Sequence, residues 1–298
     1  MFAIAVHGGA GVMNRSELSP DKEKAIHQSL ADAVEAGYQV LAKGGPALDA
    51  VEQAVRVLED AEHFNAGRGS VFTSDERHEM DASIMDGKTL KAGAVAGVKN
   101  VRNPITLART VMDKSDYVLL MAPGAEDFAR QHNLPFEPDE YFFTQQRYQE
   151  LKKKQSGEGD SRKIGTVGAV ALDQAGNVAA ATSTGGMTNK TFGRLGDSPV
   201  IGAGTYANNQ ACAVSCTGDG EYFIRAVAAY DVYCLMVYKG LSLQEACRVV
   251  VHEKLKAIEG DGGLIAVDRA GNLELAFNSE GMYRGWRNDR GEGGTAIF

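Results

Sequence analysis

Two stretches in the second half of the chain share one pattern, and this pattern limits the folds that the chain can adopt. Residues 166–183 and 263–278 each contain an apolar segment, a glycine-containing turn and a second apolar segment. Each stretch therefore predicts a β-hairpin. Val and Ala occupy consecutive positions in these segments, which is typical of strands buried on both faces. Burial on both faces requires covering layers, so we expect an α+β fold with sheets between layers of helices.

Helical patterns elsewhere in the chain supply those covering layers. A capping signal at Ser19–Asp21 begins a helix that we expect to stop at Gly44–Gly45. Apolar periodicity and composition predict further helices over residues 47–60, 104–114, 125–132, 222–240 and 242–259. Short strands are expected over residues 2–6, 79–87 and 92–98, with a glycine-rich turn at residues 7–11.

Composition narrows the class of protein. The chain has 298 residues, of which 44% are hydrophobic, enough for one large domain or two small ones. Its formal net charge of -8 argues against nucleic acid and anionic membranes as partners. The first apolar segment is too short for a signal sequence, and no apolar run approaches the roughly 20 residues that span a bilayer. We therefore expect a cytoplasmic protein without membrane partners.

The cysteines and histidines give no sign of a metal centre or a disulfide framework. None of the cysteines forms a CxxC pair, and the histidines are scattered singly along the chain. In a chain of this length we expect free, buried thiols rather than disulfides or a zinc site. The cysteines are Cys212, Cys216, Cys234 and Cys247.

A polar segment ends directly before the first of the two hairpins. Residues 155–163 contain no apolar side chain, which predicts a mobile tether, and the chain then reads Ile164-Gly165-Thr166. A threonine hydroxyl becomes an effective nucleophile beside a base, and a freed α-amine on the same residue is such a base. Cleavage before Thr166 would free an amine with a pKa of about 7.7–8.0. The alternative is an ordinary strand threonine that follows a glycine.

Further polar residues follow this threonine in a fixed order. Arg194 and Asp197 form either a surface ion pair or a clamp for a free amino acid, with Arg on the α-carboxylate and Asp on the α-ammonium. Thr217 and Gly218 precede a helical pattern and form either an oxyanion hole or an ordinary cap. The segment that begins at Thr184 has the same two interpretations, whereas His7 is interpreted as structural rather than as a base.

In their order and spacing, these segments resemble the plant-type asparaginases, also called isoaspartyl peptidases, of the N-terminal-nucleophile hydrolase superfamily. The matching segments are residues 7–11, 65–69, 80–87, 165–171, 181–186, 193–199 and 217–221. The resemblance implies an αββα four-layer sandwich and self-cleavage between Gly165 and Thr166. It implies an N-terminal subunit of residues 1–165, with a mobile linker at about 145–165, and a C-terminal subunit of residues 166–298. The two subunits are expected to form one composite domain after cleavage.

The resemblance also implies a role for individual residues. The catalytic set is Thr166 as nucleophile, Thr184 as its supporting hydroxyl, and Thr217, Gly218 and Asn65 at the oxyanion hole. The substrate-binding set is Arg194, Asp197, Gly218 and Gly220. The activation loop consists of His7, Gly8, Gly9 and Gly165. No cofactor is expected for the chemistry, but a structural sodium ion is expected on the backbone carbonyls of Leu58, Glu59, Ala61, Phe64, Ala66 and Arg68.

The implied activity is hydrolysis of L-asparagine to L-aspartate and ammonia, together with cleavage of β-aspartyl dipeptides, through an acyl-enzyme on Thr166. A homodimer of processed α-β heterodimers is the implied assembly. One alternative is a glycosylasparaginase acting on glycan-linked asparagine, although Gly165 stands where such enzymes carry an acid. A second alternative is an unprocessed amino-acid-binding module. The sequence departs from the family pattern at the bulky, charged Arg68 and in a short tail after Trp286.

Overall fold

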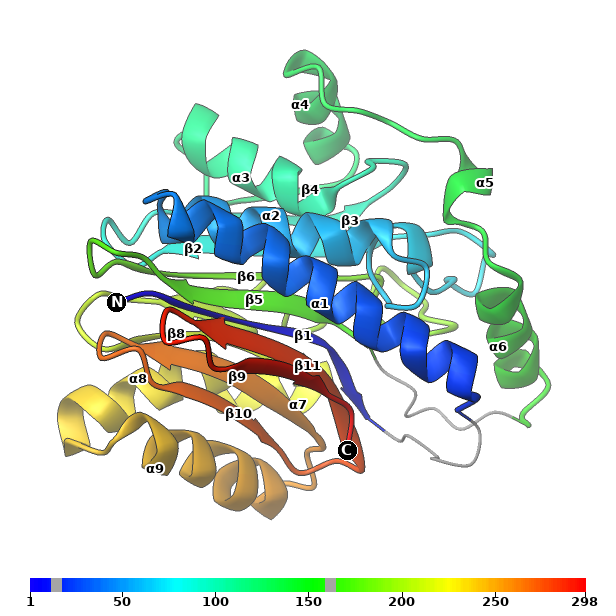
Figure 1. Cartoon of the computed structure of the whole chain (residues 1–298). Helices are drawn as coiled ribbons and strands as arrows, with labels where there is room; N and C mark the ends of the chain where they lie inside the picture. The colour runs from blue at the N-terminus through cyan, green and yellow to red at the C-terminus, as the bar shows by residue number, and fades with distance from the viewer. Residues whose placement is uncertain (12–17, 159–164) are drawn as a thin grey trace.

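Two β-sheets form the centre of the protein in the computed structural model, which describes residues 1–11, 18–158 and 165–298 (Figure 1). Over these residues the larger sheet has eight strands, in the order β12-β11-β1-β5-β6-β2-β3-β4. The smaller sheet has four strands, in the order β10-β9-β8-β7. Neighbouring strands are antiparallel except β3 and β4, which are parallel.

The strands and helices of the described residues have the following bounds. The strands are β1 (Ala3–Gly11), β2 (Met80–Asp86), β3 (Ala92–Val98), β4 (Leu119–Met121), β5 (Val167–Leu172), β6 (Val178–Thr184), β7 (Thr205–Ala207), β8 (Cys212–Gly218), β9 (Gly262–Asp268), β10 (Leu273–Phe277), β11 (Gly281–Asn288) and β12 (Gly293–Ala296). The helices are α1 (Pro20–Ala42), α2 (Ala47–Asp60), α3 (Pro104–Lys114), α4 (Gly124–Gln131), α5 (Asp139–Phe142), α6 (Gln145–Gln155), α7 (Gly220–Ala226), α8 (Ala228–Lys239) and α9 (Leu243–Arg248). A 3-10 turn, η2 (Gly67–Gly69), follows α2, and a π-helical segment, η3 (Val249–Leu255), continues α9.

Helices cover the outer faces of both sheets (Figure 1). Helices α1, α2 and α3 pack on the larger sheet around fully buried side chains such as Ile4, Leu58 and Ile84. The other face of that sheet contacts the smaller sheet through small apolar residues such as Ala5 and Ala213. Helices α8 and α9 pack on the far face of the smaller sheet. The expected mixed fold, with helices covering strands buried on both faces, is confirmed.

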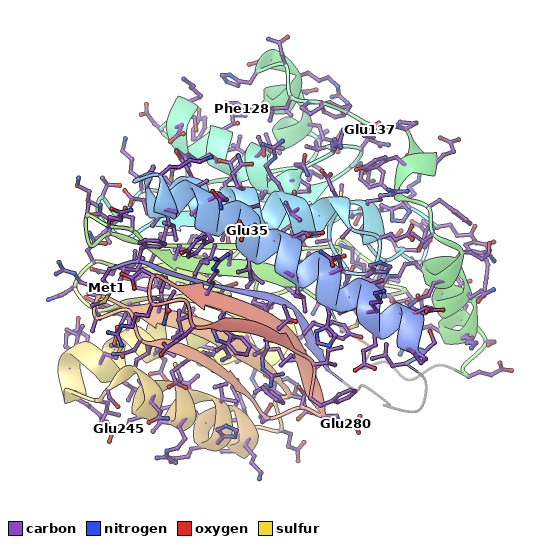
Figure 2. The ribbon with its side chains drawn as sticks, viewed as in Figure 1. Met1, Glu35, Phe128, Glu137, Glu245 and Glu280 are labelled. Carbon is purple, nitrogen blue, oxygen red and sulfur yellow. The ribbon has the colours of Figure 1, made fainter. Side chains whose placement is uncertain are left out.

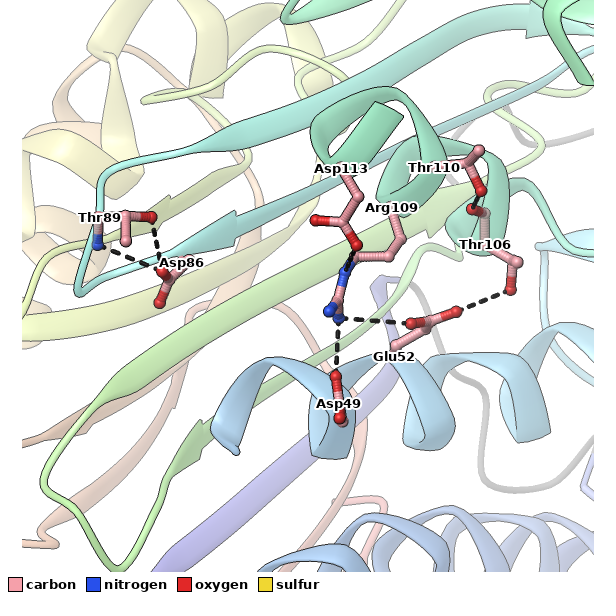
Figure 3. A network of polar contacts seen from close by, with 8 residues as sticks. All are labelled: Asp49, Glu52, Asp86, Thr89, Thr106, Arg109, Thr110 and Asp113. Atoms are coloured by element: carbon pink, nitrogen blue, oxygen red, sulfur yellow. Dashed lines mark hydrogen bonds and ion pairs between the residues drawn. The ribbon is translucent and has the colours of Figure 1, made fainter. Parts of the chain in front are cut away.

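Polar contacts tie the covering helices to one another and to the sheet. Arg109 of α3 bonds to Asp49 of α2 at 2.9 Å and to Asp113 at 2.7 Å, so its guanidinium joins the two helices (Figure 3). On the other side of α2, Glu35 of α1 pairs with Arg287 of β11 at 2.5 Å, and Figure 2 shows Glu35 on the exposed face of its helix. Exposed pairs of this kind contribute little, so apolar burial provides most of the stability.

Several local signals in the sequence place elements correctly. Ser19 caps α1 by accepting a hydrogen bond from the Lys22 N–H, with Pro20 at the first helical position. The predicted helix over residues 47–60 is α2, and the predicted strand over residues 92–98 is β3. The turn between β2 and β3 is closed by Asp86, whose carboxylate accepts the Thr89 hydroxyl at 2.6 Å (Figure 3).

The predicted glycine-rich turn at residues 7–11 is wrong, because β1 continues through it to Gly11. The pairing with β11 shifts between His7 and Gly9 and then resumes as far as the pair Gly11 and Gly281. A β-bulge of this kind inserts an extra residue without ending the strand, and glycines accommodate the altered backbone. Local glycine content therefore indicated a turn where strand pairing with β11 holds the chain extended.

The predicted helix over residues 222–240 is also wrong, because it is broken into α7 and α8 at Val227. Val227 has a φ of 50°, in the left-handed region. The backbone N–H groups of Ala229 and Tyr230 bond to the carbonyls of Ala203 and Gly202 instead of continuing α7. The helix predicted over residues 242–259 is likewise two segments, α9 and the wider η3.

Strands β4, β7, β8, β11 and β12 were not predicted, and the tail after Trp286 provides the end of β11 and the edge strand β12. Part of the expected linker is the helix α6, capped by Thr144 and with Leu151 buried, while residues 159–164 lie outside the described part of the chain.

The four cysteines are free, and all but Cys234 are buried, as expected. Over the described residues, no helix has the length and apolar character to span a membrane.

Candidate active site

Thr166 lies immediately before β5 and is 4% exposed. Its hydroxyl donates to the hydroxyl of Thr184 at 3.1 Å, because the β5–β6 hairpin pairs Val167 with Ser183 and brings the two threonines together. The Thr184 hydroxyl also accepts the Gly186 N–H at 3.0 Å and donates to the Gly165 carbonyl at 3.3 Å. One side chain thus contacts both the nucleophile candidate and the carbonyl before it.

The bulge of β1 packs against the same peptide bond. A Cβ atom on Gly9 would lie 2.7 Å from the Cα of Gly165 and 3.3 Å from the Thr166 nitrogen. Gly9 also has a φ of 117°, so both its backbone conformation and its surroundings require glycine. Gly8 packs on the ring of Phe64, where a Cβ atom would lie 2.4 Å from the ring. The expected activation loop is therefore in contact with the bond between Gly165 and Thr166.

His7 is fully buried and bonded at both ring nitrogens. Nδ1 lies 2.8 Å from the carbonyl oxygen of Thr166, and Nε2 lies 2.9 Å from the Ser215 hydroxyl. Burial lowers the pKa of His7 to about 3, so the ring is neutral at physiological pH. Because a carbonyl only accepts, Nδ1 carries the hydrogen and Nε2 accepts from Ser215. His7 thus holds the backbone of Thr166.

Of two other expected catalytic residues, Asn65 lies beside this peptide bond and Thr217 bonds to the strand that packs on it. A Cβ atom on Gly165 would lie 3.1 Å from the Cβ of Asn65, which places Asn65 beside the bond. The Asn65 amide donates to the Gly186 carbonyl at 2.7 Å and accepts the Val71 N–H at 2.9 Å. The buried Thr217 hydroxyl accepts the N–H of Ala10, on the bulged strand, at 3.1 Å.

The expected substrate clamp lies at the start of α7. Arg194 is not bonded to Asp197; its Nε and Nη2 atoms instead donate to the two carboxylate oxygens of Glu221, each at 2.7 Å. The interpretation of Arg194 and Asp197 as a surface ion pair is therefore wrong. Asp197 is 3% exposed, and its Oδ2 has no hydrogen-bond partner among the described residues. Burial raises the pKa of Asp197 to about 7. Gly220 packs on Asp197, since a Cβ atom there would lie 2.9 Å from Oδ1.

In the loop expected to bind sodium, two glycines pack closely against backbone carbonyls. A Cβ atom on Gly67 would lie 2.4 Å from the carbonyl oxygen of Glu59, and one on Gly69 would lie 2.1 Å from that of Phe64. Only glycine at these two positions leaves room for such contacts, so Gly67 and Gly69 allow the loop to fold back closely on itself. The Arg68 side chain turns outward, with its guanidinium 5.6 Å from the ring centre of Tyr141.

Some residues of the site were not found from the sequence. Glu221, which holds the guanidinium of Arg194, belongs to a segment in which the sequence indicated roles only for Thr217, Gly218 and Gly220. Ser215 is a polar residue in the largely apolar strand β8, two positions before Thr217, and that pattern was the available signal. Among the described residues, no group of three or more His, Cys, Asp or Glu side chains is arranged to hold a metal ion.

The geometry around Thr166 is that of a candidate threonine-dependent hydrolase, and comparison with known proteins agrees with it. The family model described as Asparaginase matches residues 1–297, and the chain therefore belongs to the asparaginase family.

Curated relatives are similar over nearly their whole length. The chain is 55% identical over 295 residues to the isoaspartyl peptidase of Escherichia coli (strain K12), covering 95% of this chain and 92% of that protein. It is 47% identical to the putative isoaspartyl peptidase/L-asparaginase of Dictyostelium discoideum, with the same coverage of 95% and 92%. It is 43% identical to the isoaspartyl peptidase/L-asparaginase of Homo sapiens, covering 94% of this chain and 91% of that protein.

Proposed function

We propose that this chain is a self-processing amidohydrolase that hydrolyses L-asparagine to L-aspartate and ammonia and cleaves β-aspartyl dipeptides. The observation that carries the proposal is the position of Thr184, whose hydroxyl contacts both the Thr166 hydroxyl and the Gly165 carbonyl. Membership of the asparaginase family and relatives named isoaspartyl peptidase or L-asparaginase support the same substrates.

In the processing step, the Thr166 hydroxyl attacks the carbonyl carbon of Gly165. Thr184 accepts the hydrogen bond from the attacking hydroxyl and donates to the carbonyl oxygen on which negative charge develops. The C–N bond then breaks as the acyl group moves to the Thr166 oxygen, which gives an ester, and the hydroxyl proton passes to the released nitrogen. Water hydrolyses this ester and leaves a carboxylate on Gly165 and a free α-amine on Thr166.

In the hydrolytic step, the freed amine of Thr166 accepts the proton of its own hydroxyl as that hydroxyl attacks the substrate β-amide. Arg194 holds the substrate α-carboxylate, while Asp197 and the Gly220 carbonyl hold the α-ammonium. Thr217 and Gly218 donate to the oxyanion, with Asn65 beside them. The leaving ammonia or amino acid takes the proton from the amine, and water then releases L-aspartate from the β-aspartyl ester on Thr166.

The finer organisation of the protein is part of the same proposal. We assign the two sheets and their covering helices to the αββα four-layer sandwich of N-terminal-nucleophile hydrolases, and we propose a division into subunits of residues 1–165 and 166–298. A sodium ion on the backbone carbonyls of residues 58–68 would fix the loop that carries Asn65. A homodimer of processed heterodimers in the cytoplasm completes the proposal.

The proposal predicts that the purified protein separates into two fragments in denaturing mass spectrometry, the second beginning at Thr166. The variant Thr166→Ala should remain one chain and lose hydrolysis of both substrates, because it removes the hydroxyl used in both steps. Thr166→Ser keeps that hydroxyl and should retain processing at a reduced rate. An intact wild-type chain that hydrolyses asparagine after long incubation at neutral pH would contradict self-processing.

A further inference from the structure

A continuous row of buried hydroxyl groups runs between the two sheets, from the nucleophile candidate to the substrate clamp. Ser215 bonds to His7 at 2.9 Å and to Thr182 at 2.7 Å. Thr205 then donates to Thr182 at 2.5 Å, and Ser83 lies 2.7 Å from Thr205. At the ends, His7 meets the Thr166 carbonyl at 2.8 Å, and the Ser83 hydroxyl meets the Ser198 carbonyl at 2.6 Å. We call the set His7, Ser215, Thr182, Thr205 and Ser83 the polar seam.

Strand register produces the polar seam. In the larger sheet, His7, Gly168, Thr182 and Ser83 are successive partners across β1, β5, β6 and β2. In the smaller sheet, Thr205 and Ser215 are partners across β7 and β8. Gly168 leaves the space in which the two rows meet, because a Cβ atom there would lie 2.0 Å from the Ser215 oxygen. The larger sheet thus presents one polar row to the smaller one.

The seam is an exception within its surroundings. All its side chains are fully buried, and the rest of the space between the sheets is filled by residues such as Val170, Ala180 and Ile265. Buried polar groups are costly unless their hydrogen bonds are satisfied, and an apolar row would serve packing equally well. The seam therefore requires an explanation other than stability.

The hydrogens of the seam are too few for its contacts. Six contacts run along the seam, and the Ser215 and Thr182 hydroxyls also lie 3.2 and 3.3 Å from the carbonyl oxygens of Ala181 and Gly204. A neutral imidazole and four hydroxyls carry only five hydrogens for these eight contacts. Because His7 donates to Thr166, each hydroxyl from Ser215 to Thr205 donates toward Thr166. The Ser83 hydroxyl must then divide its hydrogen between Thr205 and the Ser198 carbonyl. Ser215 and Thr182 likewise share their hydrogens with the longer contacts to Ala181 and Gly204. At the clamp end, next to Asp197, the seam and the Ser198 carbonyl thus compete for the hydrogen of Ser83.

We propose that the polar seam is a positioning network that couples the backbone of Thr166 to the backbone of the clamp at Ser198. The proposal rests on the function proposed above, in which Thr166 is the nucleophile and Asp197 holds the substrate ammonium. The seam side chains act through these residues without contacting the substrate. A change anywhere in the seam should therefore alter both turnover and amino-acid binding.

The matched pair Thr205→Val and Thr205→Ser tests the hydroxyl separately from packing. Thr205→Val keeps the shape and removes the hydroxyl, so the kcat of the processed enzyme for a β-aspartyl dipeptide should fall about three- to tenfold, and the Kd for L-aspartate should rise by a similar factor. Thr205→Ser should stay within about twofold of wild type in both. A Thr205→Val enzyme with unchanged kcat and Kd, or a Thr205→Ser enzyme as impaired as Thr205→Val, would overturn the proposal.

A second pair tests transmission along the seam and also decides the question if Thr205→Val does not fold. Ser83→Ala lies at the clamp end and Ser215→Ala at the nucleophile end. We expect each single variant to change both kcat and Kd. In both quantities, the double variant should be at most about twofold more impaired than the more impaired single variant. Additive effects, with Ser83→Ala changing only Kd and Ser215→Ala only kcat, would overturn the coupling.

Controls separate this proposal from the one on which it rests. Thr110→Val removes a hydroxyl bonded to the Thr106 carbonyl within α3, and it should leave kcat and Kd unchanged. Thermal unfolding of each variant identifies losses that come from instability alone. If Thr166→Ala retains activity, the proposed function fails. If wild type is processed and active while all seam variants resemble it, only the seam proposal fails.

Discussion

Asp197 combines deep burial with a proposed role that requires charge, the binding of the substrate ammonium. Burial raises its pKa to about 7, so below neutral pH the empty clamp holds a protonated carboxyl, which cannot pair with an ammonium ion. We therefore predict that affinity for L-aspartate increases as pH rises from 5.5 to 8, and that binding below pH 7 releases a proton. Calorimetry in buffers of different ionisation enthalpy measures both. Asp197→Asn should bind weakly with no such pH step, and a step that persists in this variant would refute the assignment.

Glu59, away from the clamp, is a second buried carboxyl group with a raised pKa. Its Oε1 accepts the Ser183 hydroxyl at 2.6 Å, its Oε2 has no partner among the described residues, and burial raises its pKa to about 8. Between the ordinary value and pH 8, the folded state binds a proton that the unfolded state releases, so stability falls as pH rises. Glu59→Gln mimics the protonated form. Between pH 5 and 9, the free energy of unfolding of this variant should fall by about 2–5 kcal/mol less than that of wild type, as measured in urea titrations. Equal decreases in the two proteins would contradict this.

At the scale of elements, the break between α7 and α8 requires an unfavourable backbone conformation at Val227. Val227 is β-branched, 45% exposed and held at a φ of 50°, a conformation that costs most L-residues about 1–2 kcal/mol. Val227→Gly should remove much of this cost and raise the thermal unfolding temperature by about 2 °C. Val227→Ala keeps the cost and should give no increase. A lower unfolding temperature for Val227→Gly would show that the Val227 side chain is needed for packing.

The elements predicted at their observed bounds are those with strong local signals. Helices α2 and α3 and strand β3 begin and end where the apolar periodicity, Pro104 and the flanking polar residues indicated. The elements that were missed depend on distant partners. The bulge of β1 is maintained by β11, and the start of α8 by the carbonyls of Gly202 and Ala203. No window of the sequence contains both members of such a pair, so propensity alone predicted a turn and one long helix.

At the scale of the whole molecule, the proposed cleavage would divide one sheet rather than separate two domains. Strands β1, β2, β3 and β4 precede Thr166, while β5, β6, β11 and β12 follow it. The two groups are interleaved in the larger sheet, because β1 lies between β11 and β5, and β6 pairs with β2. We predict that the fragments of the cleaved protein elute together in native gel filtration and unfold in one transition. Fragments that separate without denaturant would contradict the single composite domain. The uncleaved Thr166→Ala chain is the reference for elution volume.

The candidate site was only partly predictable for a related reason. Thr166, Arg194 and Asp197 could be selected because each residue type, in its local setting, suggests a chemistry. Their relative positions could not, because Thr166 and Ser198 are connected through hydroxyls from four strands and His7. The pairing of Arg194 with Glu221 rather than Asp197 was likewise decided by the packing of α7.

By itself, the sequence determined the class of fold and the residues able to do chemistry. Apolar segments are buried in any fold that the chain adopts. The threonine after Gly165 carries a hydroxyl group whatever that fold is. The tertiary structure alone decided which groups meet: Thr184 at the Gly165 carbonyl, Gly9 against the same peptide, and the polar seam between the sheets. Hydrogen bonds and pKa values depend on distances of a few ångströms, and those distances follow from strand register and layer packing across the whole chain.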